Sequence, residues 1–497
     1  MKKLSLLLLI LIILQTFSAC AARIDRELPS TTGTSEYPTE NTTDPTAEAT
    51  TEATTTATAK REEDFSAAKI TVGFARTDIT PPLGAPLSYG NIADKIFDNL
   101  YATVIAISDG ENTVLFISLD LKQAQGAILA TTFERAMTYG VTQKNVFVSA
   151  THTHSAIDYT QTSNAIVKSW LSTYREKIGT AISDALKDQT EAFIEIGSAN
   201  TDRLSFTRRY IMKDGSFKGI HTQNPSTDYE RHETEADPEL QAIKFVRNGK
   251  KDVVMVNWQA HAAHAADLIP TSVTSDYVSN FREGAEEKFG ILFAYFDGAS
   301  GNINLSSKIP GKQKYTVFTK VGTALVDVLG KALENTVRVD AGEIKISKTE
   351  FEATVNHSRD DKREIALEVV RETDVEKQKE LIKKYGFQSK YDAHAIVICS
   401  NYEKTVDLPI GVISIGEIAF VTASFEMFDT TGIYIKESSP YLMTFVCTHT
   451  NGPYNYIAPE WAFANGGYEV YTTRFIKGTA EDISSTLLDI LNKQYTR

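Results

Sequence analysis

The sequence reads NVFVSATHTHS over residues 145–155. The first half of this stretch is an apolar run typical of a buried strand, and the second half carries two histidines two residues apart. Side chains at this spacing in an extended segment point to the same side, so His152 and His154 can both face one point at the strand end. Imidazole nitrogens are common zinc ligands, although such pairs also serve as polar strand ends that bind no metal.

A second histidine cluster favours the metal interpretation. The segment NWQAHAAH, residues 257–264, follows the apolar run 253–256, so four of the nine histidines follow two strand-like segments. His261 and His264 are three residues apart, which is nearly one helical turn. His264 is therefore either an alternative ligand or a histidine on the face of a helix.

Apolar strand-like runs alternate with helical stretches along the chain. The strand-like runs are 105–107, 114–117, 243–246 and 291–294, and the helical stretches are 165–186, 277–288 and 316–333. Such alternation is typical of an α/β fold in which mixed β-sheets pack against helices.

Local patterns also predict elements in the last third of the chain. The charged segment 360–385 predicts two solvent-facing helices. Two apolar runs, 410–415 and 418–423, flank Gly416-Glu417 and predict a hairpin. A final helix is expected over 482–492.

The N-terminal 67 residues lack the features of a folded domain. Residues 1–19 have the charged start and apolar core of a signal peptide. Residues 17–20, Phe-Ser-Ala-Cys, resemble the cleavage box of bacterial lipoproteins. We therefore expect Cys20 to be lipidated and to anchor the protein on the extracytoplasmic side of a bacterial cell membrane; the alternative is an ordinary signal peptide with an incidental cysteine. Residues 20–67 are rich in Thr and Glu and predict a flexible stalk, which leaves 68–497 as the folded domain.

Charge and cysteine content exclude some classes of protein. The formal net charge is −13 and no cluster of Lys and Arg is present, so nucleic-acid binding is not expected, because that function requires clustered cations. Cys399 and Cys447 each belong to an apolar segment that predicts a strand, beginning with residues 395–398 and 443–446 respectively. Buried free thiols are the favoured interpretation of these two residues, and a disulfide between them is the alternative.

Three motifs resemble the catalytic domain of the neutral ceramidase family, whose members are zinc-dependent amidases. They are THTHS at 151–155, VGFARTDIT at 72–80 and NGPYNYI at 451–457, and they occur in the family's order. The resemblance extends in scattered motifs from Ile70 to the C-terminus. It implies a neutral-ceramidase-like fold, with no residues remaining for the C-terminal β-sandwich domain that family members usually carry.

The resemblance implies a set of zinc ligands. Two histidines, a glutamate and a tyrosine hold zinc in the family, and the matching positions are His152, His261, Glu426 and Tyr456. Zn²⁺ accepts such mixed nitrogen and oxygen ligands. Without the resemblance, Glu426 would be interpreted as a solvated loop acid and Tyr456 as a packing aromatic residue.

The resemblance also implies residues that act on the substrate. His154 is expected to move a proton to the leaving amine, and Tyr468 and Arg208 to stabilise the oxyanion. Asn304 stands where ceramidases have a serine in a Gly-x-x-Ser-Pro loop, and it can donate a hydrogen bond but is not a nucleophile. An early family histidine is also missing near residues 97–100. Long-chain ceramide is therefore expected to be a poor substrate.

Two further polar residues have competing interpretations. Asp78 resembles an early family aspartate, and its alternative role is to form a turn. Arg209 follows Arg208 directly, and we interpret it as a surface cation.

The sequence therefore predicts a zinc-dependent hydrolase of a small-molecule or lipid N-acyl substrate. Two alternatives stay open. The first is a catalytically inactive surface protein that binds lipid or glycan, and the second is a metal-dependent deacylase of N-acyl sugars.

Overall fold

The computed structural model describes residues 64–219, 228–305 and 317–495. The expected signal peptide, the lipidated Cys20 and most of the expected stalk lie outside these described residues. Within the described ranges, no helix has the length and apolar character needed to cross a membrane.

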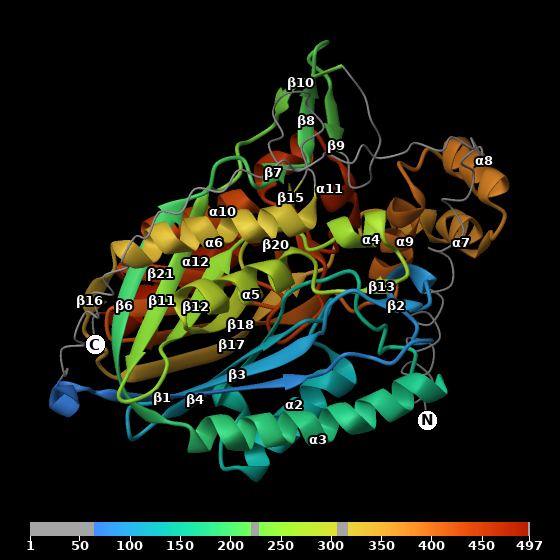
Figure 1. Cartoon of the computed structure of the whole chain (residues 1–497). Helices are drawn as coiled ribbons and strands as arrows, with labels where there is room; N and C mark the ends of the chain where they lie inside the picture. Colours follow the sequence, from blue (N-terminus) through green and yellow to red (C-terminus); the bar gives the residue numbers. More distant parts are fainter. Residues whose placement is uncertain (1–63, 220–227, 306–316, 496–497) are drawn as a thin grey trace, which may run out of the picture.

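A nine-stranded sheet forms the centre of the molecule (Figure 1). Its strand order is β14-β12-β11-β6-β1-β3-β4-β5, and β16 pairs with β6. Most neighbours are antiparallel, but β4 and β5 are parallel, as are β12 and β14. The strands are β1 (Ile70–Asp78), β3 (Tyr101–Ser108), β4 (Thr113–Leu119), β5 (Val146–Ala150), β6 (Thr190–Asn200), β11 (Glu239–Arg247), β12 (Val253–Trp258), β14 (Leu292–Asp297) and β16 (Val337–Val339).

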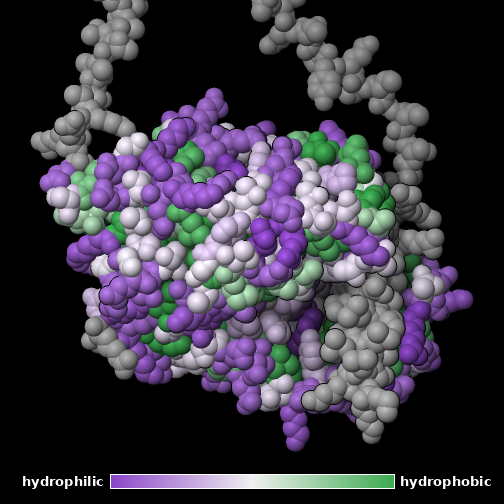
Figure 2. Space-filling view, turned by 90° about the horizontal axis from the view of Figure 1, so that it is seen from below, coloured by the Kyte–Doolittle hydropathy of each residue, from purple (hydrophilic) through white to green (hydrophobic). Residues whose placement is uncertain are grey.

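Two pairs of helices cover one face of this sheet. They are α2 (Gly126–Thr138) with α3 (Ala165–Lys187), and α5 (Tyr277–Phe289) with α6 (Phe318–Glu334). The close approach of α3 to β1 requires a glycine, because a Cβ on Gly73 would lie 1.9 Å from the Ala185 carbonyl oxygen. Figure 2 views the molecule from the side of α2 and α3, where hydrophilic and hydrophobic residues are intermixed.

A second, four-stranded sheet covers the other face. It has the order β17-β18-β19-β21, with β17 (Ile344–Thr354), β18 (Thr405–Ile415), β19 (Ile418–Ala423) and β21 (Met443–Cys447). Helices α10 (Asp429–Ser438) and α12 (Thr479–Tyr495) pack on its outer side. The architecture is therefore four layers in the order helix, sheet, sheet, helix.

Aromatic residues fill the space between the two sheets. Phe116 on β4 lies with its ring centroid 4.5 Å from that of Phe420 on β19 and 5.8 Å from that of Phe147 on β5. All three side chains are buried. Alternate residues of each strand face this layer, as expected for strands buried on both faces.

Smaller elements surround the four layers. Short strand pairs are β2 (Lys95–Ile96) with β13 (Ser272–Val273), β7 (Phe206–Thr207) with β15 (Ile303–Asn304), and β20 (Glu426–Met427) with β22 (Tyr456–Ile457); β8 (Arg209–Met212), β9 (Phe217–Gly219) and β10 (Tyr229–His232) form a small sheet. The remaining helices are α4 (His264–Leu268), α7 (Arg363–Arg371), α8 (Val375–Tyr385), α9 (Lys390–Cys399) and α11 (Tyr468–Thr472).

Most of the expected elements are present. The three long helices, the helical pair α7 and α8, the β18–β19 hairpin and the final helix are confirmed within a few residues. The strand expected at 395–398 is wrong, because these residues belong to α9. Ser389 caps that helix by accepting a hydrogen bond from the Asp392 N–H, and Ala393, Ile396 and Val397 pack on α7 at helical spacing. Cys399 and Cys447 are buried free thiols.

We predict that Phe116→Ala will lower the free energy of unfolding by roughly 3–5 kcal/mol, because it opens a cavity between the two sheets. Chemical denaturation monitored by circular dichroism measures this change. Tyr434→Ala is the control, since Tyr434 is an aromatic residue that is 54% exposed on α10, and it should have little effect. Equal losses in the two variants would contradict the assigned sheet–sheet core.

Candidate metal centre

The ends of strands from both sheets converge at one place. The backbone N–H of Ala150 donates to the His449 carbonyl, that of Thr448 to the Asp297 carbonyl, and that of Thr450 to the Ala423 carbonyl. These bonds join the ends of β5, β14, β19 and β21. The four predicted ligands lie in the segments that follow these strands and β12.

The two non-histidine candidates are brought together by a short parallel strand pair. Glu426 on β20 and Tyr456 on β22 are register partners. The side chains of His152, His261, Glu426 and Tyr456 are all buried. The structure thus assembles four residues that are spread over 305 positions of the sequence.

The donor atoms of these four residues lie close together. Glu426 Oε2 is 3.1 Å from His261 Nε2 and 3.7 Å from His152 Nε2. The Tyr456 hydroxyl oxygen is 3.3 Å from His261 Nε2. These separations are close to those of ligands that share one small cation, whose bonds to nitrogen and oxygen are ~2.0–2.2 Å long.

Backbone carbonyls orient both imidazoles. His152 Nδ1 donates to the Lys122 carbonyl at 2.7 Å, and His261 Nδ1 donates to the Ser300 carbonyl at 2.8 Å. Each ring therefore presents the lone pair of Nε2 to the site, which is the usual support of a metal-ligating histidine. Burial lowers the pKa of both histidines, so both are neutral and able to bind a metal at neutral pH.

The charge state of Glu426 also suits a cation. Burial alone would raise the pKa of its carboxyl, but the 3.1 Å contact with His261 Nε2 and the neighbouring imidazoles together lower it. Burial and the nearby Glu426 raise the pKa of Tyr456. Two neutral imidazoles, a carboxylate and a phenol provide the nitrogen and oxygen donors that zinc accepts, so these residues fit a single divalent ion.

His154 makes a second ligand set possible. Its Nε2 lies 3.1 Å from His152 Nε2, and His152, His154 and His261 have ligand atoms within 4.8 Å of one another. The other ring nitrogen of His154, Nδ1, contacts the Tyr89 hydroxyl. Both possible sets contain His152 and His261. Glu426 and Tyr456 complete the first set, and His154 completes the second.

Arg208 connects the remaining predicted residues to the centre. Its guanidinium donates to the Tyr456 hydroxyl at 3.0 Å, to the Gly301 carbonyl at 2.7 Å and to Asn304 Oδ1 at 3.4 Å. The Tyr468 ring centroid lies 5.9 Å from Arg208 Cζ and 5.6 Å from the Tyr456 centroid. The structure therefore brings every predicted site residue of the described chain to one place.

The interpretation of Arg209 as a surface cation is wrong. Its side chain is 0% exposed and forms ion pairs with Glu233 and Glu469. Glu469 also pairs with Arg208 at 2.7 Å, so one buried carboxylate holds two adjacent arginines. Buried charges require such partners, because desolvation is costly.

The sequence also left open the roles of Asp78 and His264. Asp78 forms a turn at the end of β1, where its carboxylate accepts from the Thr80 N–H at 2.7 Å and from Asn99 Nδ2 at 3.1 Å. His264 is the first residue of α4, as in the helix-face alternative.

Several residues around the centre were not singled out from the sequence. The His449 ring stacks on His152 with centroids 3.8 Å apart and lies 3.4 Å from the Asp297 carboxylate. Tyr89 and Lys122 flank His154 and His152. His449, Asp297 and Lys122 all lie at or just after strand ends, and this is the one sequence signal that they share with the predicted ligands.

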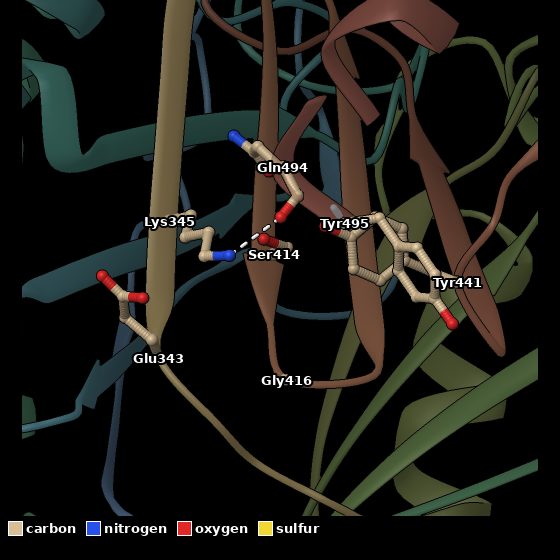
Figure 3. Close-up of a pocket in the computed structure, with 7 residues that line it drawn as sticks. All are labelled: Glu343, Lys345, Ser414, Gly416, Tyr441, Gln494 and Tyr495. Carbon is tan, nitrogen blue, oxygen red and sulfur yellow. Dashed lines mark hydrogen bonds between the residues drawn. The ribbon is translucent and has the colours of Figure 1, made fainter. Parts of the chain in front are cut away.

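A separate hollow lies at the Gly416 turn of the β18–β19 hairpin (Figure 3). Its volume is about 150 Å³, and Lys345 in its wall donates to the Gln494 carbonyl at 2.8 Å. The lining contains none of the residues of the candidate metal centre. It consists of Glu343, Lys345, Ser414, Gly416, Tyr441, Gln494 and Tyr495.

Comparison with known proteins bears on the family resemblance and the fold. Residues 71–282 match the family described as "Neutral/alkaline non-lysosomal ceramidase, N-terminal". The resemblance to the neutral ceramidase family is thereby confirmed. Neutral ceramidase 1 of Arabidopsis thaliana is 24% identical over 241 residues, which is 45% of this chain and 29% of that protein. The matched part thus spans less than a third of the curated relative.

Two solved structures share the fold. Neutral ceramidase from Pseudomonas aeruginosa superposes with a TM-score of 0.64 at 16% identity, covering 86% of this chain and 75% of that one. A ceramidase complexed with C2 gives a TM-score of 0.64 at 15% identity, covering 86% and 76%. The chain therefore has the mixed α/β fold of neutral ceramidases, as expected from the motifs.

We predict that one divalent metal, zinc, copurifies in equimolar amount and that His152→Ala or His261→Ala abolishes its binding. His264→Ala is the matched control, because His264 lies outside the cluster of His152, His154 and His261 whose ligand atoms are within 4.8 Å of one another, and it should retain the metal. Because burial lowers the pKa of His152 and His261 below the usual value of about 6.5, proton competition should start only at lower pH, and affinity should change little between pH 8 and 6.5. Elemental analysis and calorimetry measure both effects.

His154→Ala separates the two ligand sets. If Glu426 and Tyr456 complete the site, this variant should keep its metal. Loss of metal from His154→Ala, with retention by Glu426→Gln, would show instead that the three histidines form the site.

Proposed function

We propose that this protein is a zinc-dependent hydrolase of an N-acyl amide. The observation that carries the proposal is the register pair Glu426 and Tyr456, placed against two histidines whose Nδ1 atoms are bound to backbone carbonyls. The family resemblance supports a hydrolase, and the donor set supports zinc.

Zinc supplies Lewis acidity that activates water and polarises an acyl carbonyl. The protein's own groups complete the chemistry. Arg208 is fixed by Glu469 and by the Gly301 carbonyl, so its guanidinium is preorganised to stabilise an oxyanion beside Tyr456. Burial, followed by the charge of Lys122, lowers the pKa of His154. The imidazole of His154 is therefore neutral and can accept a proton before passing it to the leaving amine.

Asn304 makes ceramide a poor substrate in this proposal. Its Oδ1 accepts from Arg208, and the motif resemblance places this amide where ceramidases have a serine hydroxyl. Changing a polar group beside the reacting atoms can alter discrimination strongly. The substrate is expected to be an N-acyl amide other than long-chain ceramide.

We predict that the zinc-loaded protein releases amine from an N-acyl compound in a panel that contains ceramide, N-acyl sugars and N-acyl amino acids. His261→Ala should be inactive, and Arg208→Lys should lower kcat by roughly 10²–10³, since a lysine cannot reproduce the paired donors. Chromatography of the released amine measures turnover. A zinc-loaded protein that binds lipid or glycan but hydrolyses nothing would instead be an inactive binding protein.

The proposed location is the extracytoplasmic face of a bacterial membrane, with Cys20 as the lipid attachment point. We predict that the full chain partitions with membranes and that Cys20→Ala releases it, because each buried methylene of an acyl chain contributes about 0.8 kcal/mol. Cys399→Ala is the matched control and should not change partitioning, since Cys399 is a buried thiol. Recovery of the wild type in the soluble fraction with an unmodified N-terminus would contradict this location.

A further inference from the structure

A lysine that forms no ion pair with the described residues stands beside the candidate metal centre. Lys122 follows β4 and is half-buried. Its ammonium lies 4.7 Å from the centroid of the Tyr89 ring. Among the described residues, the ammonium has neither an ion pair nor a hydrogen bond. Such a group retains donors for a ligand, because an ammonium has three N–H bonds and a ring face satisfies only part of them.

The backbone around Lys122 is held rigidly to the site. The Lys122 carbonyl accepts from His152 Nδ1 at 2.7 Å, and the next carbonyl, that of Gln123, accepts from the Tyr159 hydroxyl at 2.7 Å. On the other side, Asp120 pairs with Arg282. The ammonium is therefore carried on a segment whose main chain is tied directly to a candidate metal ligand.

The acidic side chains near Lys122 have other partners, so the ammonium can bind a ligand. The nearby Asp158 carboxylate already accepts from the Thr160 N–H and from Gln161 Nε2. Glu426 is the other nearby acid, and it belongs to the candidate ligand set. Arg208 already donates hydrogen bonds to Glu469, the Gly301 carbonyl and Tyr456. Lys122 is thus the free cation in the described surroundings of the centre.

The position of Lys122 indicates which half of the substrate its ammonium would contact. Tyr89 contacts both groups, since its ring lies under the Lys122 ammonium and its hydroxyl meets His154 Nδ1. His154 is the residue that serves the leaving amine in the proposed function. An anionic group held by Lys122 would therefore belong to the amine half. A single ammonium matches the single charge of a carboxylate better than a phosphate dianion, which usually requires several donors or an arginine fork.

We propose that Lys122 binds a carboxylate on the amine half of the substrate, so that N-acyl amino acids are preferred over uncharged N-acyl amino alcohols. This inference rests on the proposed amide hydrolysis and assigns its substrate class. Lys122 acts as a specificity residue, and the bond that breaks is the amide bond of the proposed function.

Two amides with the same acyl chain test the inference. N-dodecanoylglycine carries a carboxylate where N-dodecanoylethanolamine carries a hydroxymethyl group. The zinc-loaded wild type should favour the glycine compound in kcat/KM, and Lys122→Gln should reduce kcat/KM for that compound by roughly 10- to 100-fold, mainly through KM, since a charge-assisted hydrogen bond is lost. The loss on the ethanolamide should be much smaller, and Lys122→Arg, which keeps the positive charge beside His154, should restore part of the preference.

Lys144→Gln is the matched control, because Lys144 is exposed, and it should leave the preference intact. Equal use of the two amides by the wild type, or equal losses for both in Lys122→Gln, would overturn the inference. Thermal melting of each variant shows whether it is folded.

A binding measurement tests this inference independently of the proposed amide hydrolysis. Calorimetry with N-dodecanoylglycine compares the wild type and Lys122→Gln regardless of turnover. Hydrolysis of no compound in the panel would reject the proposed function. If these two amides are not hydrolysed, weaker binding by Lys122→Gln would still support the carboxylate site, and unchanged binding would reject it.

Discussion

The packing of two sheets face to face places the ends of their strands at one edge of the molecule. Phe116, Phe147 and Phe420 fill the space between the sheets, and the segment 448–451 then joins strands from both sheets through backbone hydrogen bonds. The candidate ligands follow these strands. Their convergence is a consequence of the sheet packing, since no local contact could bring residues 152 and 456 together.

Periodicity was sufficient to predict most elements, but not their partners. The helices α3, α5 and α6 are long and strongly patterned, and such segments are the most predictable. The apolar run 395–398 was ambiguous, because four consecutive apolar residues fit a buried strand or a buried helix equally well. Arg209 was misjudged because its partners, Glu233 and Glu469, are distant in sequence, and only tertiary structure brings them to the arginine.

Prediction of the candidate site depended on two different kinds of signal. His152 and His261 stand out as histidines after apolar runs, so residue type and spacing identify them. Glu426 and Tyr456 carry no such local mark and were found only through the family motifs. Lys122 and His449 belong to no motif, and their importance depends on their contacts. The His449 ring stacks on His152, and the Lys122 carbonyl accepts a hydrogen bond from His152 Nδ1.

The pairing of β20 with β22 limits which parts of this chain can change length. Successive residues of a strand point to opposite sides, so a slip of one position would exchange Glu426 for Phe425 or Met427 and turn an apolar side chain toward the histidines. Insertions and deletions are therefore excluded from the short segments that flank these two strands. The turn at 439–442, between α10 and β21, is free of that restriction and can accommodate changes in length as related sequences diverge.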